Sequence, residues 1–310
     1  MKELLVGNAP CSWGLLENQD KSKAIKFNQM LDELVETGYT GTELGDWGFM
    51  PTDPAQLSEE LAKRNNIVML GAFVPVAMKN PAAHAAGVAM AVKTAKLIAA
   101  VATTQAPHLV LSDDNGTDPA RTRMAGRITA SEGLSKDEWK TFAKGADRIA
   151  GSVFDETGLR TVFHHHCAGY VETPDEIATL LELTNPDRLG LVFDSGHYVH
   201  GTGSEDIDIV AALNRFKERI WYIHLKDIDP NVARRSREKQ WDYFTQMRHG
   251  LYPELGKGCI DLPALLHWLG ARDYKGYALV EQDILPGMGT PKASAARNRE
   301  YIRSIESNFA

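Results

Sequence analysis

Ionisable side chains follow four short apolar runs in the second half of the chain. They are His164 and His166, Asp194 and His197, His224 with Lys226 and Asp227, and Glu281. Two imidazoles and two carboxylates can form a mixed nitrogen and oxygen coordination sphere, which suits Mn²⁺, Co²⁺, Zn²⁺ or Fe²⁺ better than a metal that prefers thiolates. We therefore expect one divalent metal ion at His164, Asp194, His224 and Glu281. Mn²⁺ or Co²⁺ is our first assignment, with Zn²⁺ or Fe²⁺ as alternatives.

The triplet His164, His165 and His166 has a spacing that strand geometry makes meaningful. Neighbouring residues of a strand point to opposite faces and residues two apart share a face, so His164 and His166 can face one site together. A solvated histidine cluster is the competing interpretation when the triplet is taken alone.

Asp194 directly follows Leu191, Val192 and Phe193, an apolar setting in which an uncompensated carboxylate is costly. Asp194 could instead cap the helix that follows it. A cap would leave His224 and Glu281 without an explanation, whereas a single metal ion accounts for all three residues.

A base that removes a proton from the substrate has three candidates near the expected metal. His166, His197 or Lys226 could serve if its pKa is tuned toward neutrality, and the sequence does not rank them. For Lys226 the competing interpretation is a lysine paired with Asp227.

Other residues are candidates for contact with a sugar-like substrate. Glu43 and Asp46 could bind hydroxyl groups, and Trp13 and Trp47 could form a wall against a ring. Lys257 could reach the substrate from a long loop. The competing interpretations are surface acids for the two carboxylates and packing at the barrel mouth for the two tryptophans.

Eight short apolar runs alternate with helical segments, and this order is typical of stacked βα units. The runs are 4–10, 40–46, 67–74, 108–113, 159–166, 189–194, 220–225 and 277–282. The expected helices are 21–37, 54–65, 82–102, 136–156, 174–183, 206–217, 262–269 and 293–307. Eight units favour a closed (β/α)8 TIM barrel over an open doubly wound sheet, with residues 1–310 forming a single domain. In such a barrel all strand ends meet at one face, so the residues that follow the strands converge there.

Two connections, 114–134 and 227–260, are unusually long for a compact domain. Long loops of this kind commonly serve as lids or substrate walls.

Composition excludes several classes of protein. The chain has 310 residues, of which 43% are hydrophobic, and a formal net charge of -7, which disfavours nucleic acid as a partner. The three cysteines show no CxxC pair, the N-terminus lacks a signal-peptide run, and no apolar run could span a bilayer. We expect a soluble, unprocessed cytoplasmic protein that has no membrane partner; assembly into a homo-oligomer stays open.

Several ordered motifs together resemble the xylose isomerase-like barrel superfamily, and within it the inosose dehydratases. The motifs lie at 8–14, 163–166, 171–174, 193–197, 223–227, 255–258 and 280–283, so that the resemblance covers nearly the whole chain. The resemblance implies a metal at the ends of strands five to eight, with Asp194, His224 and Glu281 as ligands. It also implies that His197 lies near the substrate or behind the ligands.

One position departs from the pattern of that superfamily. Many members have Glu where this sequence has His164, and members similar to inosose dehydratase share the histidine form. Glu172, in Glu-Thr-Pro at an expected helix entrance, is a reserve ligand candidate that is more simply explained by local capping.

A metal with open positions can polarise a carbonyl and ease removal of the adjacent proton. Loss of a β-hydroxyl then gives dehydration, whereas reprotonation gives epimerisation or aldose–ketose isomerisation. The resemblance implies a dehydratase that acts on an inosose (a keto-inositol) or a similar small polyhydroxylated carbonyl compound, with a sugar isomerase or epimerase as the alternative. A metal-dependent abasic-site endonuclease would need more ligands and a basic surface, and a metal-free carbohydrate-binding protein is a further alternative.

Overall fold

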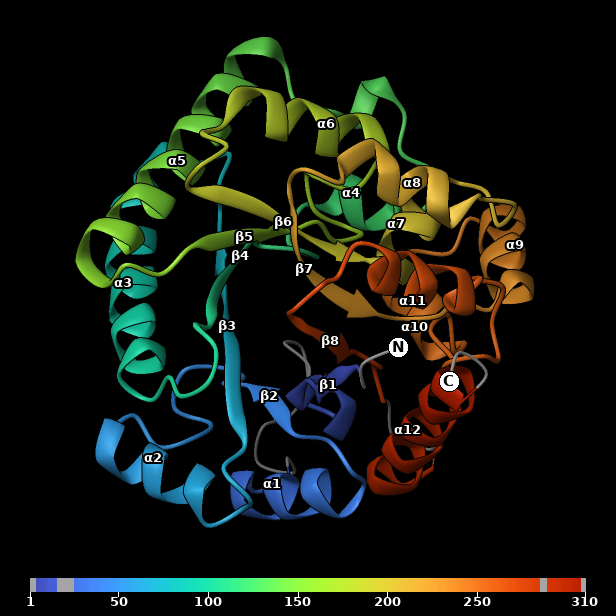
Figure 1. Cartoon of the computed structure of the whole chain (residues 1–310). Helices are drawn as coiled ribbons and strands as arrows, with labels where there is room; N and C mark the ends of the chain where they lie inside the picture. The colour runs from blue at the N-terminus through green and yellow to red at the C-terminus, as the bar shows by residue number, and fades with distance from the viewer. Residues whose placement is uncertain (1–3, 16–24, 285–288, 308–310) are drawn as a thin grey trace.

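Eight parallel strands form a closed barrel in the computed structural model, which describes residues 4–15, 25–284 and 289–307 (Figure 1). The strands are β1 (Leu5–Asn8), β2 (Gly41–Glu43), β3 (Val68–Val76), β4 (His108–Asp113), β5 (Thr161–His164), β6 (Leu189–Asp194), β7 (Ile220–Leu225) and β8 (Tyr277–Val280). Each strand pairs with the next along the chain, and β1 pairs with β8, where Leu5 lies opposite Tyr277. The predicted TIM barrel is confirmed.

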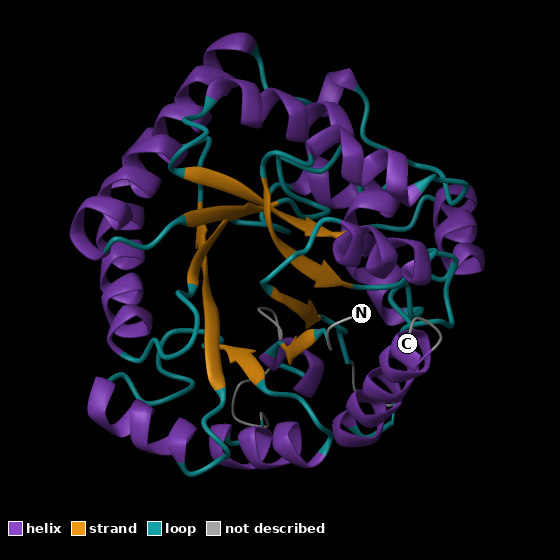
Figure 2. Ribbon diagram, viewed as in Figure 1, coloured by secondary structure: helices purple, strands orange, loops and turns teal. Residues whose placement is uncertain are grey.

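Helices surround the strands on the outside of the barrel (Figure 2). They are α1 (Phe27–Glu36), α2 (Pro54–Ala62), α3 (His84–Ala100), α4 (Pro119–Met124), α5 (Lys136–Thr157), α6 (Pro174–Leu183), α7 (Ser195–Gly201), α8 (Ile209–Phe216), α9 (Pro230–Lys239), α10 (Tyr243–Arg248), α11 (Leu262–Ala271) and α12 (Pro291–Ser307). Short 3₁₀ turns occur at Pro10–Trp13, Pro81–Ala83 and Ala130–Glu132. The part of the first expected helix at 21–24 lies outside the described residues. No helix among the described residues is both long and apolar enough to cross a bilayer.

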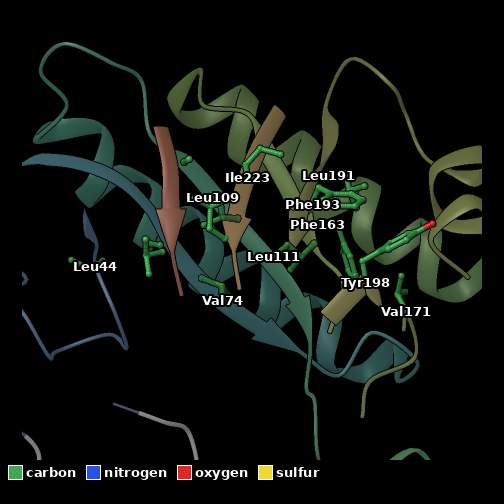
Figure 3. Close-up of a cluster of buried hydrophobic side chains, with 14 of the residues drawn as sticks. Leu44, Val74, Leu109, Leu111, Phe163, Val171, Leu191, Phe193, Tyr198 and Ile223 are labelled. Atoms are coloured by element: carbon green, nitrogen blue, oxygen red, sulfur yellow. The ribbon is translucent and has the colours of Figure 1, made fainter. Parts of the chain in front are cut away.

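The strands are apolar because the barrel buries both of their faces. Phe163, Leu191 and Phe193 belong to the larger core cluster, between the sheet and the helices (Figure 3). Val162 and Val192, one position away in the same strands, belong to the smaller cluster inside the barrel. His164 and Asp194 lie two residues beyond Val162 and Val192 in the same strands, so their side chains point to the same, inner side of the barrel. This places two polar groups at the mouth of the barrel.

Helix starts follow side-chain caps that the sequence encodes. Ser135 and Thr173 each form a complete capping box, with Glu138 and Glu176 respectively, as expected for the starts of α5 and α6. Both caps satisfy backbone N–H groups that a helix start leaves without partners, and they fix where the preceding loops end.

The two long connections contain short helices that are not among the eight expected helices. Residues 114–134 contain α4, and residues 227–260 contain α9 and α10. Each begins at an aspartate cap, namely Asp118, Asp229 and Asp242. α4 and α10 have only six residues each, and α9 is polar along most of its length, so none of the three shows a clear apolar periodicity and the caps were their main sequence signal.

Candidate metal centre and cavity

Four side chains from the last four strands converge at the mouth of the barrel. His164 ends β5, Asp194 ends β6, His224 lies near the end of β7, and Glu281 directly follows β8. One potential ligand atom from each lies within 4.8 Å of all the others. Asp194 and His224 are direct partners in the register between β6 and β7, which places their side chains side by side. The structure thus brings together all four residues that the sequence predicted as a metal group.

The donor atoms of this group face one another. The Oε2 atom of Glu281 lies 3.0 Å from Nδ1 of His224 and 3.5 Å from Nε2 of His164. The Oδ2 atom of Asp194 lies 3.7 Å from Nε2 of His164. Burial opposes the charge on His224, but the carboxylates of Glu281 and Glu43 outweigh burial and raise the pKa of His224 to about 10. The centre therefore favours positive charge.

Several of these atoms are buried without a hydrogen-bond partner. Both ring nitrogens of His164 and the Oδ2 atom of Asp194 have none among the described residues. Orphaned polar atoms in a protein interior are costly, and a cation bound by Nε2 of His164 and Oδ2 of Asp194 would satisfy these two atoms together, with Nδ1 of His164 left outside the donor set. The donor set of two imidazoles and two carboxylates fits a divalent ion of the Mn²⁺, Co²⁺, Zn²⁺ or Fe²⁺ type.

Asp194 has two roles, one for each carboxylate oxygen. Oδ1 accepts a hydrogen bond from the backbone N–H of His197 at 2.8 Å and caps α7, while Oδ2 faces His164. The cap and the metal ligand, which were competing interpretations of the sequence, are therefore compatible. The cap holds the side chain in the orientation that presents Oδ2 to the centre.

His166 borders a cavity of about 620 Å³ above the donor group. Its Nδ1 atom lies 2.6 Å from the carbonyl oxygen of Cys167, and because a carbonyl only accepts, Nδ1 carries the hydrogen. Burial, together with the positive charges of His164 and Lys226, lowers the pKa of His166 to about 3. The neutral ring therefore has its lone pair on Nε2.

His197 and Lys226 are deeply buried behind His166 and do not line the cavity. The rings of His197 and His166 have centroids 3.8 Å apart, and the Nδ1 atom of His197 accepts from the backbone N–H of Cys167. The ammonium of Lys226 donates to Asp283 at 3.0 Å rather than to Asp227. Asp227 instead accepts backbone N–H bonds from the loop at 256–260. Of the three predicted bases, His166 is the one that the cavity reaches.

The cavity wall combines strand ends with the long connections. The lining residues are Ala9, Pro10, Cys11, Leu15, Glu43, Gly45, Asp46, Phe73, Gly116, His164, His166, His224, Asp242, Tyr243, Phe244, Met247, Arg248, Glu281 and Asp283. Glu43, a predicted substrate contact, also lies 3.2 Å from Nε2 of His224. The expectation that the connection at 227–260 forms a wall agrees with the position of α10.

Three predicted substrate contacts lie away from the cavity. Trp13 is buried, with its Nε1 donating to Glu33 of α1. Trp47 lies under the ammonium of Lys93, beside a separate hollow between α2 and α3. Lys257 is largely exposed and pairs with Glu254. Each side chain contacts another residue instead, and none of the three is among the residues that line the cavity.

The reserve candidate Glu172 also lies outside the donor group. Its carboxylate accepts backbone N–H bonds from Gly126 and Ala168, which ties the β4 and β5 loops together.

The sequence interpretation missed several residues of the cavity. Asp283 had a signal, because it lies two positions beyond Glu281 and an extended segment would place both on one face. Tyr243, Phe244 and Met247 had none, because their position depends on how α10 packs against the rest of the barrel.

Comparison with known proteins agrees with this architecture. A model of the xylose isomerase-like TIM barrel family matches residues 31–305. The chain belongs to this family. Among relatives of this xylose isomerase-like barrel, the inosose dehydratase of Geobacillus kaustophilus (strain HTA426) is 29% identical over 297 residues, covering 96% of this chain and 93% of that protein. The inosose dehydratase of Clostridium beijerinckii (strain ATCC 51743 / NCIMB 8052) is 26% identical over 302 residues, or 97% of each chain. A D-allulose 3-epimerase from Methylomonas sp. has a similar fold, with a TM-score of 0.67, 15% identity and coverage of 98% of this chain and 99% of that one.

Proposed function

We propose that this protein is a metal-dependent hydro-lyase that removes water from an inosose or a closely similar polyhydroxylated ketone. The observation that carries the proposal is the position of His166, whose cavity-facing ring borders the donor group of His164, Asp194, His224 and Glu281. The inosose dehydratases among its relatives support the choice of substrate. This activity would place the protein in inositol catabolism.

A divalent ion held by the four donors would supply Lewis acidity toward the substrate carbonyl. The remaining chemistry belongs to the chain. His166 removes the proton from the carbon next to the carbonyl, because its Nε2 lone pair is available and its Nδ1 hydrogen is held by Cys167. Its pKa of about 3 keeps Nε2 unprotonated at neutral pH but makes the ring a weak base. The step therefore depends on the acidity that a bound divalent ion would give to the C–H bond, and on the Glu281 carboxylate, which acts to raise the pKa of His166. The Cys167 bond keeps the ring in one tautomer and one orientation.

The neighbours of His166 support the ring after it has gained a proton. Lys226 is held by Asp283 and Glu281, whose charges raise its pKa against the opposing effect of burial. Their carboxylates also border the cavity and offset the positive charge that His166 acquires. Glu43, across the cavity, is placed to accept hydrogen bonds from substrate hydroxyls while it holds the His224 ring.

The test is to incubate the purified protein with Mn²⁺ or Co²⁺ and scyllo-inosose and to follow the absorbance of the dione that forms on loss of water. We expect turnover that disappears on chelation and returns with the metal. The same protein with Glu281→Gln is the matched negative control. Interconversion of ketoses without water loss would show that the protein is an isomerase or epimerase instead.

A further inference from the structure

Water loss needs a proton donor as well as a base. Hydroxide is a poor leaving group, so the departing β-hydroxyl must take up a proton as its C–O bond breaks. On the proposed function, on which this inference rests, His166 is occupied with the proton that comes from carbon. The donor must therefore be another residue of the cavity wall.

Tyr243, the first residue of α10, borders the cavity with only 6% of its surface exposed. Its ring approaches the ring of His166 edge to face, with centroids 5.6 Å apart. A substrate that contacts the His166 ring therefore also lies within reach of Tyr243.

The hydroxyl of Tyr243 differs from those of Tyr39 and Tyr252, which have partners, and from that of Tyr222, which is fully enclosed without one. Tyr39 donates to the carbonyl of Ala295, and the Tyr252 hydroxyl lies 2.9 Å from Nδ1 of His197. Within residues 4–15, 25–284 and 289–307 no side chain or carbonyl is in hydrogen-bond contact with the Tyr243 hydroxyl. Unlike the Tyr222 hydroxyl, that of Tyr243 is not among the fully enclosed atoms, and Tyr243 borders the cavity. A ligand in the cavity can therefore accept its hydrogen bond.

We propose that the Tyr243 hydroxyl donates the proton that converts the departing substrate hydroxyl into water. The C–H bond next to the carbonyl breaks, and its proton goes to Nε2 of His166. The electron pair left on carbon forms the new C=C bond as the C–O bond breaks. The leaving oxygen takes the Tyr243 proton, and the proton on His166 returns through solvent to the phenolate. The net change is loss of one water molecule.

The surroundings of Tyr243 suit this role. Burial and the negative charge of Asp283 raise the pKa of Tyr243, so the phenol keeps its proton at neutral pH. The positive charge of Lys226 acts in the opposite direction and stabilises the phenolate that forms during the step. Both charges reside on side chains that are themselves paired, so the field at the hydroxyl is fixed.

α10 is held in place, which a proton donor requires. The buried Gln246 donates to the carbonyls of Ala125 and Trp241 at 3.0 and 2.9 Å, and its Oε1 lies 2.6 Å from Nε2 of His200. These bonds join α10 to α7 and to the loop after β4. Tyr243 therefore lies at a defined position over the cavity.

The experiment uses Tyr243→Phe in the full-length metal-loaded protein, with scyllo-inosose in D₂O. Proton NMR measures deuterium entry next to the carbonyl, and absorbance measures water loss. The matched control is Tyr39→Phe, which removes the phenol oxygen of another buried tyrosine, one that does not line the cavity. We expect Tyr243→Phe to slow water loss by about 100-fold or more while deuterium entry stays within about threefold of wild type. Thermal midpoint and metal content should stay unchanged.

A second measurement uses a substrate in which fluorine replaces the departing hydroxyl. Fluoride leaves with little help from an acid, so Tyr243→Phe should eliminate it nearly as fast as wild type. If Tyr243→Phe loses water at the wild-type rate, or if deuterium exchange and water loss slow equally, Tyr243 is not the proton donor. Either result leaves the proposed function standing. A wild-type protein that exchanges deuterium and never loses water would overturn the proposed function together with this inference.

Discussion

The Nδ1 atom of His166 lies 2.6 Å from the carbonyl oxygen of Cys167, and this contact leaves the lone pair of the neutral ring on Nε2. His166→Asn tests the role of the other nitrogen, because its amide N–H can still donate to Cys167 while Nε2 is lost. We expect both deuterium entry and water loss to fall by about 10² to 10⁴-fold. Metal content should stay at the wild-type level.

The control for His166→Asn is His84→Gln, because the Nε2 atom of the buried His84 also contacts a backbone carbonyl, that of Met78, and neither residue lines the cavity. If His166→Asn exchanges deuterium at the wild-type rate, His166 is not the base.

Glu281 is the donor that contacts both imidazoles of the group. Glu281→Gln replaces a carboxylate by a neutral amide of the same shape, so it should lose activity and metal while keeping the fold. Mutating a residue that only hydrogen-bonds to a metal ligand lowers metal affinity by about 10- to 100-fold. Because Glu281 is itself a proposed ligand, its replacement should lower the affinity by more than that. Elemental analysis and competition with a metal-binding dye measure the effect. Glu254→Gln is the control, and a Glu281→Gln protein with stoichiometric metal would refute the assignment.

Glu43 holds the far side of the His224 ring, with Oε1 3.2 Å from Nε2. Glu43→Gln weakens the contact with Nε2 of His224 and leaves all four proposed metal ligands in place. We expect metal affinity to fall by about 10- to 100-fold, with one ion still bound at saturation. Titration of Co²⁺, followed by its visible spectrum, reports both the affinity and the geometry. An unchanged metal affinity would mean that Glu43 does not support the His224 ligand and can act only on the substrate.

The fold and the donor group could be predicted because both depend on local patterns. Each apolar run marks a strand, and closure of a parallel barrel brings the residues that follow the strands to one face. His164, Asp194, His224 and Glu281 were assigned from these strand ends together with the motifs that resemble the xylose isomerase-like superfamily.

The cavity wall could be predicted only in part: Glu43, Asp46 and the connection at 227–260 do line it, but its other side chains depend on packing between distant segments. Trp13 and Trp47 have side chains suited to packing against a sugar-like ring, but they contact Glu33 and Lys93 respectively and do not line the cavity. Tyr243 reaches the cavity because Gln246 bonds to Ala125, more than a hundred residues earlier in the chain. No local pattern encodes such a contact.

Arg121 is completely buried and forms a two-pronged ion pair with Glu176, at 2.7 and 2.8 Å. It also donates to the carbonyl of Gly169 in the β5 loop. Arg121→Met would leave the Glu176 carboxylate buried without its partner, which should cost about 3 to 5 kcal/mol of stability. Urea denaturation measures this change. Arg123→Met, at an exposed position of the same helix, is the control, and a loss below about 1 kcal/mol would contradict this account of the ion pair.

Glu172 makes stability depend on pH in the direction opposite to that of an ordinary ion pair. Burial raises its pKa to about 7, although Arg121 and two backbone N–H groups act against the rise. In the unfolded chain the pKa returns to its usual value near 4.5, so between these values the folded state binds more protons. Stability must then fall as the pH rises through this window, by about 3 kcal/mol in total, and level off above it.

Comparison with Glu172→Gln isolates this contribution, because the amide does not titrate and resembles the protonated acid. The free energy of unfolding of wild type minus that of the variant should decrease from pH 4.5 to pH 7. A difference that stays flat across this range would show that Glu172 is ionised in the folded protein throughout. A difference that increases with pH would mean that Arg121 and the backbone donors outweigh burial.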